Sequence, residues 1–169
     1  MRRRALGLTL GAVLLSPGIA ASADEASLTG SYSGIVACDR TEDGRPGVFQ
    51  LALQIRVLQE GERLHIATWT AEDEALQRKK PSLYAGKAAV ADGMVSGYAR
   101  VCRPDFAYEE LLRILPARAE GGALSFSADT VFVTEALPGR EGSLITESCR
   151  WVMVRDSAEP PELERCAPE

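Results

Sequence analysis

The chain has 169 residues, of which 46% are hydrophobic and 25% charged, and its 24 acidic and 19 basic residues give a net charge of −5. This length fits one domain, and this apolar fraction is sufficient to form a hydrophobic core. The composition therefore excludes a large multidomain enzyme, a disordered tail and a nucleic-acid-binding protein that relies on bulk positive charge.

Residues 1–23 have the order of an export signal. Arginines at positions 2–4 precede an apolar run at 5–15, and a small-x-small cleavage site ends at Ala23. The apolar run is shorter than the roughly 20 residues of a transmembrane helix, so we expect Sec export and cleavage after Ala23 instead of a membrane anchor. Residues 24–169 then form a single domain with 16 basic and 24 acidic residues, a net charge of −8. This charge disfavours nucleic acid and stable membrane insertion.

The composition of the exported part predicts its compartment. Asparagine is absent, and alanine and glycine are abundant, which is typical of a GC-rich bacterial genome. An even number of cysteines in an exported domain predicts two disulfides, with three possible connectivities. The cysteines are Cys38, Cys102, Cys149 and Cys166, and we favour the pairs Cys38–Cys102 and Cys149–Cys166. The sequence thus predicts a bacterial periplasmic or secreted protein with structural disulfides.

Alternation of apolar and polar residues predicts β-strands along most of the chain. The clearest example is 49–57, where every odd position is large and apolar. Glu60-Gly61, Asp92-Gly93 and Gly121-Gly122 are suited to hairpin turns. In chain order, the predicted strands cover residues 30–38, 49–57, 63–68, 84–90, 94–102, 112–119, 123–128 and 144–154.

About eight strands joined by hairpins predict an all-β antiparallel meander. Closure into a small barrel removes exposed strand edges, and a two-sheet sandwich is the alternative. Residues 70–80 have acids at the start, lysines at the end and Pro81 behind them, which predicts one short helix. Residues 106–115 fit either a strand or a helix. We expect an extended tail from about residue 156, pinned to the barrel by Cys166.

The acidic segment 39–44 begins like a calcium-binding loop, with oxygen ligands at its first, third and fifth positions and glycine at its sixth. The twelfth position, where a glutamate should complete the coordination shell, is Gln50, and flanking helices are not predicted. We therefore predict a hairpin and no metal site here.

Four residues are candidate contacts for a ligand or a partner. His65 is the only histidine, and Trp69 lies four residues later on the same strand face. Glu147 shares the apolar face of the last strand with Cys149 and Trp151. A buried glutamate needs a partner or must become neutral. The candidate contacts are therefore His65, Trp69, Glu147 and Trp151.

No pattern of a serine hydrolase, a zinc protease or a P-loop is present, and we expect neither catalysis nor a cofactor. Paired acids can hydrolyse glycosides, but candidates such as Glu109, Glu110 and Glu147 are too numerous to choose among. An eight-stranded barrel is either filled by side chains or holds one small ligand. The first hypothesis is a non-catalytic barrel that binds a small ligand or an envelope component. The alternative is an acidic inhibitor or partner-binding protein of a basic envelope or secreted enzyme.

Overall fold

The structure is a computed structural model. It describes residues 27–72, 80–103, 109–120, 123–137 and 140–166. The predicted signal peptide, residues 1–23, lies outside the described residues. Within the described residues, no helix is long and apolar enough to cross a membrane.

The described chain is built almost entirely of antiparallel β-strands. In chain order they are β1 (Gly30–Glu42), β2 (Arg45–Glu60), β3 (Arg63–Thr70), β4 (Ser82–Ala91), β5 (Met94–Arg103), β6 (Glu109–Ala117), β7 (Ala119–Glu120), β8 (Ala123–Leu137) and β9 (Arg140–Ser157). Of the helix predicted at 70–80, Ala71 and Glu72 are helical, Thr70 ends β3, and residues 73–79 lie outside the described residues.

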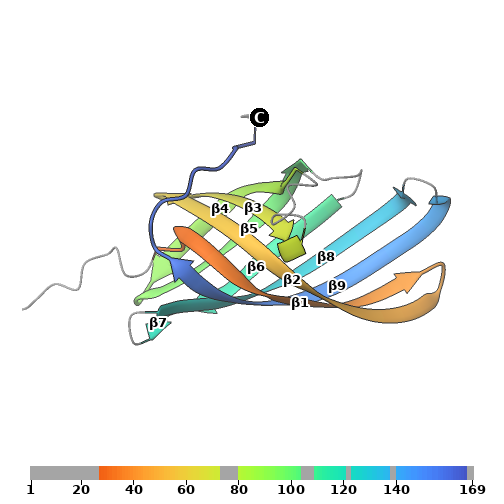
Figure 1. Cartoon of the computed structure of the whole chain (residues 1–169), viewed down its shortest axis with the longest axis horizontal. Helices are drawn as coiled ribbons and strands as arrows, with labels where there is room; N and C mark the ends of the chain where they lie inside the picture. Colours follow the sequence, from red (N-terminus) through yellow and green to blue (C-terminus); the bar gives the residue numbers. More distant parts are fainter. Residues whose placement is uncertain (1–26, 73–79, 104–108, 121–122, 138–139, 167–169) are drawn as a thin grey trace, which may run out of the picture.

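Eight of these strands close into a barrel. The order of neighbours runs β6-β5-β4-β3-β2-β1-β9-β8, and β6 also pairs with β8, so no long edge is left open. The two-residue β7 pairs with the start of β8. The hairpins β1–β2 and β8–β9 are longer than the others and project beyond the remaining strands at one end of the barrel (Figure 1). The predicted closed barrel is confirmed, and the sandwich alternative is wrong.

The strands form where the sequence alternates. In β2, Leu53, Ile55 and Val57 are buried in the barrel, while the residues between them face outward. The predicted turn at Asp92-Gly93 is confirmed, because both residues have the positive φ of a type I′ hairpin, 52° and 71°. The acidic segment 39–44 forms the end of β1 and another such turn, which confirms the predicted hairpin.

One half of the barrel interior is filled by packed side chains. The Tyr32 hydroxyl donates a hydrogen bond to the backbone carbonyl of Leu28 at 2.7 Å, and the Tyr32 ring meets Phe126 edge to face at 4.9 Å. Arg155 stacks over the same tyrosine ring, 5.6 Å from its centroid. Fully buried side chains surround this group and include Val57, Leu64, Ile66, Val95, Leu124 and Met153. This end of the barrel is therefore a solid core.

The predicted pair of disulfides is confirmed, but the favoured connectivity is wrong. The structure joins Cys38 to Cys149 and Cys102 to Cys166. Barrel closure places β1 beside β9, so Cys38 and Cys149 are direct cross-strand partners on the inner face. Cys102 lies on the outward face of β5, where it cannot reach the inward-facing Cys38.

The C-terminal tail, residues 158–166, returns to the outer surface of the barrel after β9. Its Arg165 forms two hydrogen bonds with the carboxylate of Glu60 at 2.9 and 3.1 Å, and its Glu164 pairs with Arg103. Together with the bond from Cys166 to Cys102, these contacts hold the tail against the barrel. The predicted disulfide-pinned tail is confirmed.

Candidate functional site

The second half of the barrel interior contains a cavity of about 250 Å³ at the end where the long hairpins project. Its walls come from seven of the eight barrel strands, all except β5. Apolar side chains of β2 and β9 form much of the wall, among them Phe49, Leu51, Leu53 and Trp151. Leu51 is still 42% exposed, which shows that the cavity opens to solvent on this side.

Glu147 brings a carboxyl group into this cavity from β9. Its side chain is only 6% exposed, and Arg40 of β1 lies 3.4 Å from its Oε1. Arg40 is shared, because Glu42 lies 3.5 Å away from the same guanidinium. Burial raises the pKa of Glu147 to about 7, an effect that Arg40 opposes and Glu110 reinforces. Near neutral pH, Glu147 therefore exchanges between its neutral and its charged form.

Glu110 adds a second carboxyl group from β6. It is 8% exposed and accepts a hydrogen bond of 2.8 Å from the hydroxyl of Tyr84 on β4. The strand register places Glu110 opposite Phe132, and Phe132 opposite Glu147. Neighbouring strands are about 4.8 Å apart, so the two glutamate Cα atoms are separated by about 10 Å across β8. The two acids thus flank the Phe132 ring on one row of the wall.

The aromatic wall beside these acids is fixed in place. Trp151 is 4% exposed, and its indole Nε1 donates to the hydroxyl oxygen of Thr130 at 3.1 Å. The Cys38–Cys149 disulfide also lines the cavity, and its Cys149 lies two residues before Trp151 on β9. Because the indole N–H is already bonded, Trp151 offers a ligand its ring and no further donor.

The structure places two of the four candidate contacts inside the cavity, one at its rim and one on the outer face. Glu147 and Trp151 face the cavity from β9. His65 faces outward from β3, with its Nε2 4.0 Å from Glu60, next to the tail residue Arg165. Burial lowers the pKa of His65, and the charge of Arg165 lowers it further.

Trp69 also lies on β3, at the rim of the cavity. The guanidinium of Arg56 lies over its ring, 5.0 Å from the centroid. Its indole is thus engaged by an outward-facing arginine of β2, whereas Trp151 is enclosed within the barrel.

Glu147 also lies near the inner disulfide. One of its carboxyl oxygens and the sulfur atoms of Cys38 and Cys149 all lie within 4.8 Å of one another. Its Oε2 is 3.9 Å from the sulfur of Cys149. The sulfur atoms of Cys38 and Cys149 are bonded to each other, so neither is a thiolate that can bind a metal ion. This group consequently acts as part of the cavity wall.

Sequence reasoning did not single out Glu110, Tyr84 or Arg40. Glu110 was one of several equivalent acids, because residues 106–115 fit both a strand and a helix. The available signal was strand parity: once β6 is a strand, Glu110 shares the inner face with Leu112 and Ile114. The alternation of β1 places Arg40 on the inner face by the same reasoning.

Neither a protein-family model nor a curated protein matches this chain.

Proposed function

We propose that this protein is an exported, non-catalytic binding protein that holds a small molecule in the open half of its barrel. The observation that carries the proposal is the cavity of about 250 Å³, which holds two buried carboxyl groups between apolar and aromatic walls. Binding pockets are typically apolar with a few convergent polar groups. The two disulfides favour an oxidising compartment, consistent with the predicted export signal at residues 1–23.

The size of the cavity limits the ligand. An engineered apolar cavity of about 150 Å³ holds benzene, and drug-sized ligands occupy about 300 Å³ or more. A volume of about 250 Å³ lies between these values. It suits a single ring or a compact aliphatic group that carries one polar substituent.

Tryptophan fluorescence gives a direct test, because the chain has only two tryptophans: Trp151 is enclosed in the cavity and Trp69 lies at its rim. In a Trp69→Phe background, Trp151 is the single reporter. We would titrate benzyl alcohol, benzylamine and phenylacetate to millimolar concentrations. We expect a saturable 1:1 change in Trp151 emission with at least one of these probes.

Two substitutions on β1 locate the binding. Val36→Phe places a larger side chain in the cavity, whereas Ile35→Phe enlarges a residue that is 53% exposed on the outer face. We expect Val36→Phe to abolish the emission change and Ile35→Phe to leave it intact. If no probe changes the emission, or if both variants bind equally well, the cavity is not a binding site.

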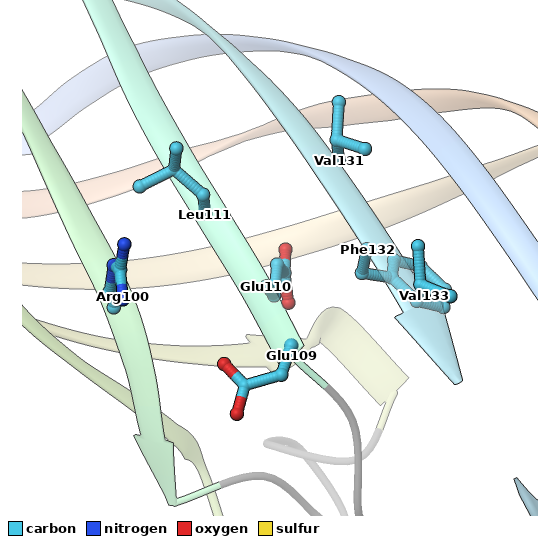
Figure 2. A pocket seen from close by; sticks show the side chains of 7 residues that line it. All are labelled: Arg100, Glu109, Glu110, Leu111, Val131, Phe132 and Val133. Atoms are coloured by element: carbon cyan, nitrogen blue, oxygen red, sulfur yellow. The ribbon is translucent and has the colours of Figure 1, made fainter. Parts of the chain in front are cut away.

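A second candidate function is the binding of a protein partner, and a feature of the outer wall favours it. Leu111 on β6 and Val131 on β8 are cross-strand neighbours that are 44% and 59% exposed, and Val133 extends this apolar patch. Figure 2 shows the patch, with Arg100 on one side and Glu109 at the start of β6. Exposed apolar patches with polar edges are typical of interaction sites.

The partner hypothesis predicts a complex with a basic protein, in keeping with the expected net charge of −8. Lysozyme is a suitable basic test protein. The hypothesis requires binding that weakens with salt and that Val131→Lys on the patch reduces, because the added positive charge repels a basic partner. Binding that persists in Val131→Lys would show that the patch is not the contact surface.

A further inference from the structure

The charged residues of the cavity wall differ in sign and in burial. Three lining residues are charged: Glu110, Glu147 and Lys80. Both glutamates are more than nine-tenths buried, whereas Lys80 is exposed at the rim. The interior of the cavity is thus an acidic site with its cation at the entrance.

Arg40 neutralises this acidic site only in part. It does not line the cavity, and it is shared between Glu147 and Glu42. Its distance of 3.4 Å from Glu147 exceeds the roughly 2.8 Å of a charge-assisted hydrogen bond. The carboxylate of Glu147 therefore keeps acceptor capacity for a donor inside the cavity.

The uncharged part of the wall also favours a cation. Phe132 lies between the two acids on the register row, and Tyr84 and Trp151 line the same space. Aromatic ring faces attract ammonium groups, most strongly where water is excluded. An anionic ligand would instead lie beside two buried carboxyl groups, which repel it wherever they are ionised.

We infer that the ligand is a small primary amine on a single ring or compact apolar group, with its ammonium held by Glu110 and Glu147 and its apolar part against Phe132 and Trp151. This inference rests on the proposed binding function and specifies its ligand class. An ammonium has three donors and no acceptor, which matches the acceptor capacity that remains on the carboxylate of Glu147. A neutral alcohol has one donor and gains no charge pairing.

Amine binding should be coupled to the release of a proton from Glu147. The groups that face Glu147 are Arg40 and Glu42 from β1, Glu110 from β6 and Tyr84 from β4, with Lys80 at the rim. An ammonium in the cavity adds a positive charge, which favours the ionised carboxylate. The charged fraction of free Glu147, whose pKa is about 7, falls from about nine-tenths at pH 8 to about one-tenth at pH 6. We therefore expect the affinity for the amine to fall about tenfold over this interval.

The test compares three probes of similar size and different charge in the Trp69→Phe background. Benzylamine is a cation at both pH values, benzyl alcohol is neutral and phenylacetate is an anion. At pH 8 we expect benzylamine to bind at least about tenfold more tightly than benzyl alcohol, and phenylacetate to bind least. We expect Glu110→Gln to reduce this preference severalfold, whereas Glu109→Gln, an exposed neighbour on the outer face, should leave it unchanged.

Two experiments test the coupling between amine binding and proton release: one uses a substitution, and the other uses the unaltered chain. Glu147→Gln should remove the tenfold pH dependence of benzylamine binding, whereas Glu109→Gln on the outer face should retain it. Titration calorimetry of the unaltered chain in phosphate and in MES at pH 6 should show release of nearly one proton per bound benzylamine. This second measurement decides the linkage even where the variant does not fold.

Each outcome separates the ligand class from the binding function. If benzyl alcohol or phenylacetate binds as tightly as benzylamine, and Val36→Phe blocks both, the amine inference is wrong and the proposed function stands. Absence of proton release with tight benzylamine binding overturns the role of Glu147. If none of the probes binds, the proposed function itself fails.

Discussion

The buried carboxyl group of Glu147 should make the protein less stable as the pH rises. Burial raises its pKa from 4.5 to about 7, despite the opposing charge of Arg40. Between these two values the folded protein keeps a proton on Glu147 that the unfolded chain has released. Because the folded state binds more protons in this window, raising the pH lowers the free energy of unfolding.

The size of this effect follows from the pKa difference. One pKa unit corresponds to about 1.4 kcal/mol, so the ionised group lowers the free energy of unfolding by about 3 kcal/mol above pH 7. Between about pH 5 and about pH 8 the change is about 2.5 kcal/mol, because a smaller part is already lost at the lower pH. Domains of this kind are stable by only about 5–15 kcal/mol, so the effect is large enough to measure.

The assay is urea unfolding of the disulfide-intact chain at both pH values, with Glu147→Gln for comparison. Glutamine has the shape of the protonated glutamate and carries no charge at either pH. We expect the stability gained by the variant over the native chain to be about 2.5 kcal/mol larger at pH 8 than at pH 5. Glu109→Gln removes one charge from an exposed site and serves as the control.

The refuting result is a Glu147→Gln variant whose stability differs from that of the native chain by the same amount at both pH values. Glu147 would then ionise as it does in the unfolded chain, and its buried, partly neutralised environment would not exist in solution. Any constant effect of the amide cancels in this comparison, because only the change with pH is used.

Three further predictions concern the barrel itself and are checked by urea unfolding. Removing the inner disulfide by Cys38→Ala with Cys149→Ala opens a loop of 111 residues and should cost about 4–5 kcal/mol by chain entropy, whereas a loss below about 1 kcal/mol would contradict this account. Tyr84→Phe removes the hydroxyl donor to the buried acid of β6 and should cost about 1.5–3 kcal/mol, and an unchanged midpoint would refute the hydrogen bond. Gly86→Ala would press a methyl group into the backbone of β5 and should cost about 3 kcal/mol, whereas Gly47→Ala faces open space and should stay within about 0.5 kcal/mol. Equal effects of the two alanines would show that β4 and β5 are not so closely packed.

The strands and their turns could be predicted because their signals are local. Alternation over 49–57 identified most of β2, and Asp92-Gly93 has the residues that a type I′ turn requires. The disulfide connectivity could not be predicted in this way. Cys38 meets Cys149 because the first and last strands become neighbours on closure, over a separation of 111 residues. Such a contact depends on the whole topology and leaves no local pattern.

The candidate site was predictable only on the strand whose face was already clear. The apolar alternation of β9 placed Glu147 with Trp151, and the structure puts both at the cavity. The inward position of Glu110 could not be predicted, because residues 106–115 fit both a strand and a helix. A one-residue change of strand parity would have placed Glu109 inside and Glu110 outside.

The two halves of the interior differ in how their side chains affect the stability of the fold. Around Tyr32 the barrel is closed by apolar contacts that stabilise it without any occupant. Around Glu147 the same barrel leaves a cavity and holds a carboxyl group whose ionisation costs about 3 kcal/mol near neutral pH. A leucine at that position would avoid this cost, so packing alone does not account for a glutamate there. A bound ammonium removes the penalty by pairing the charge, so ligand binding and folding stability should rise together at the pH where Glu147 is ionised.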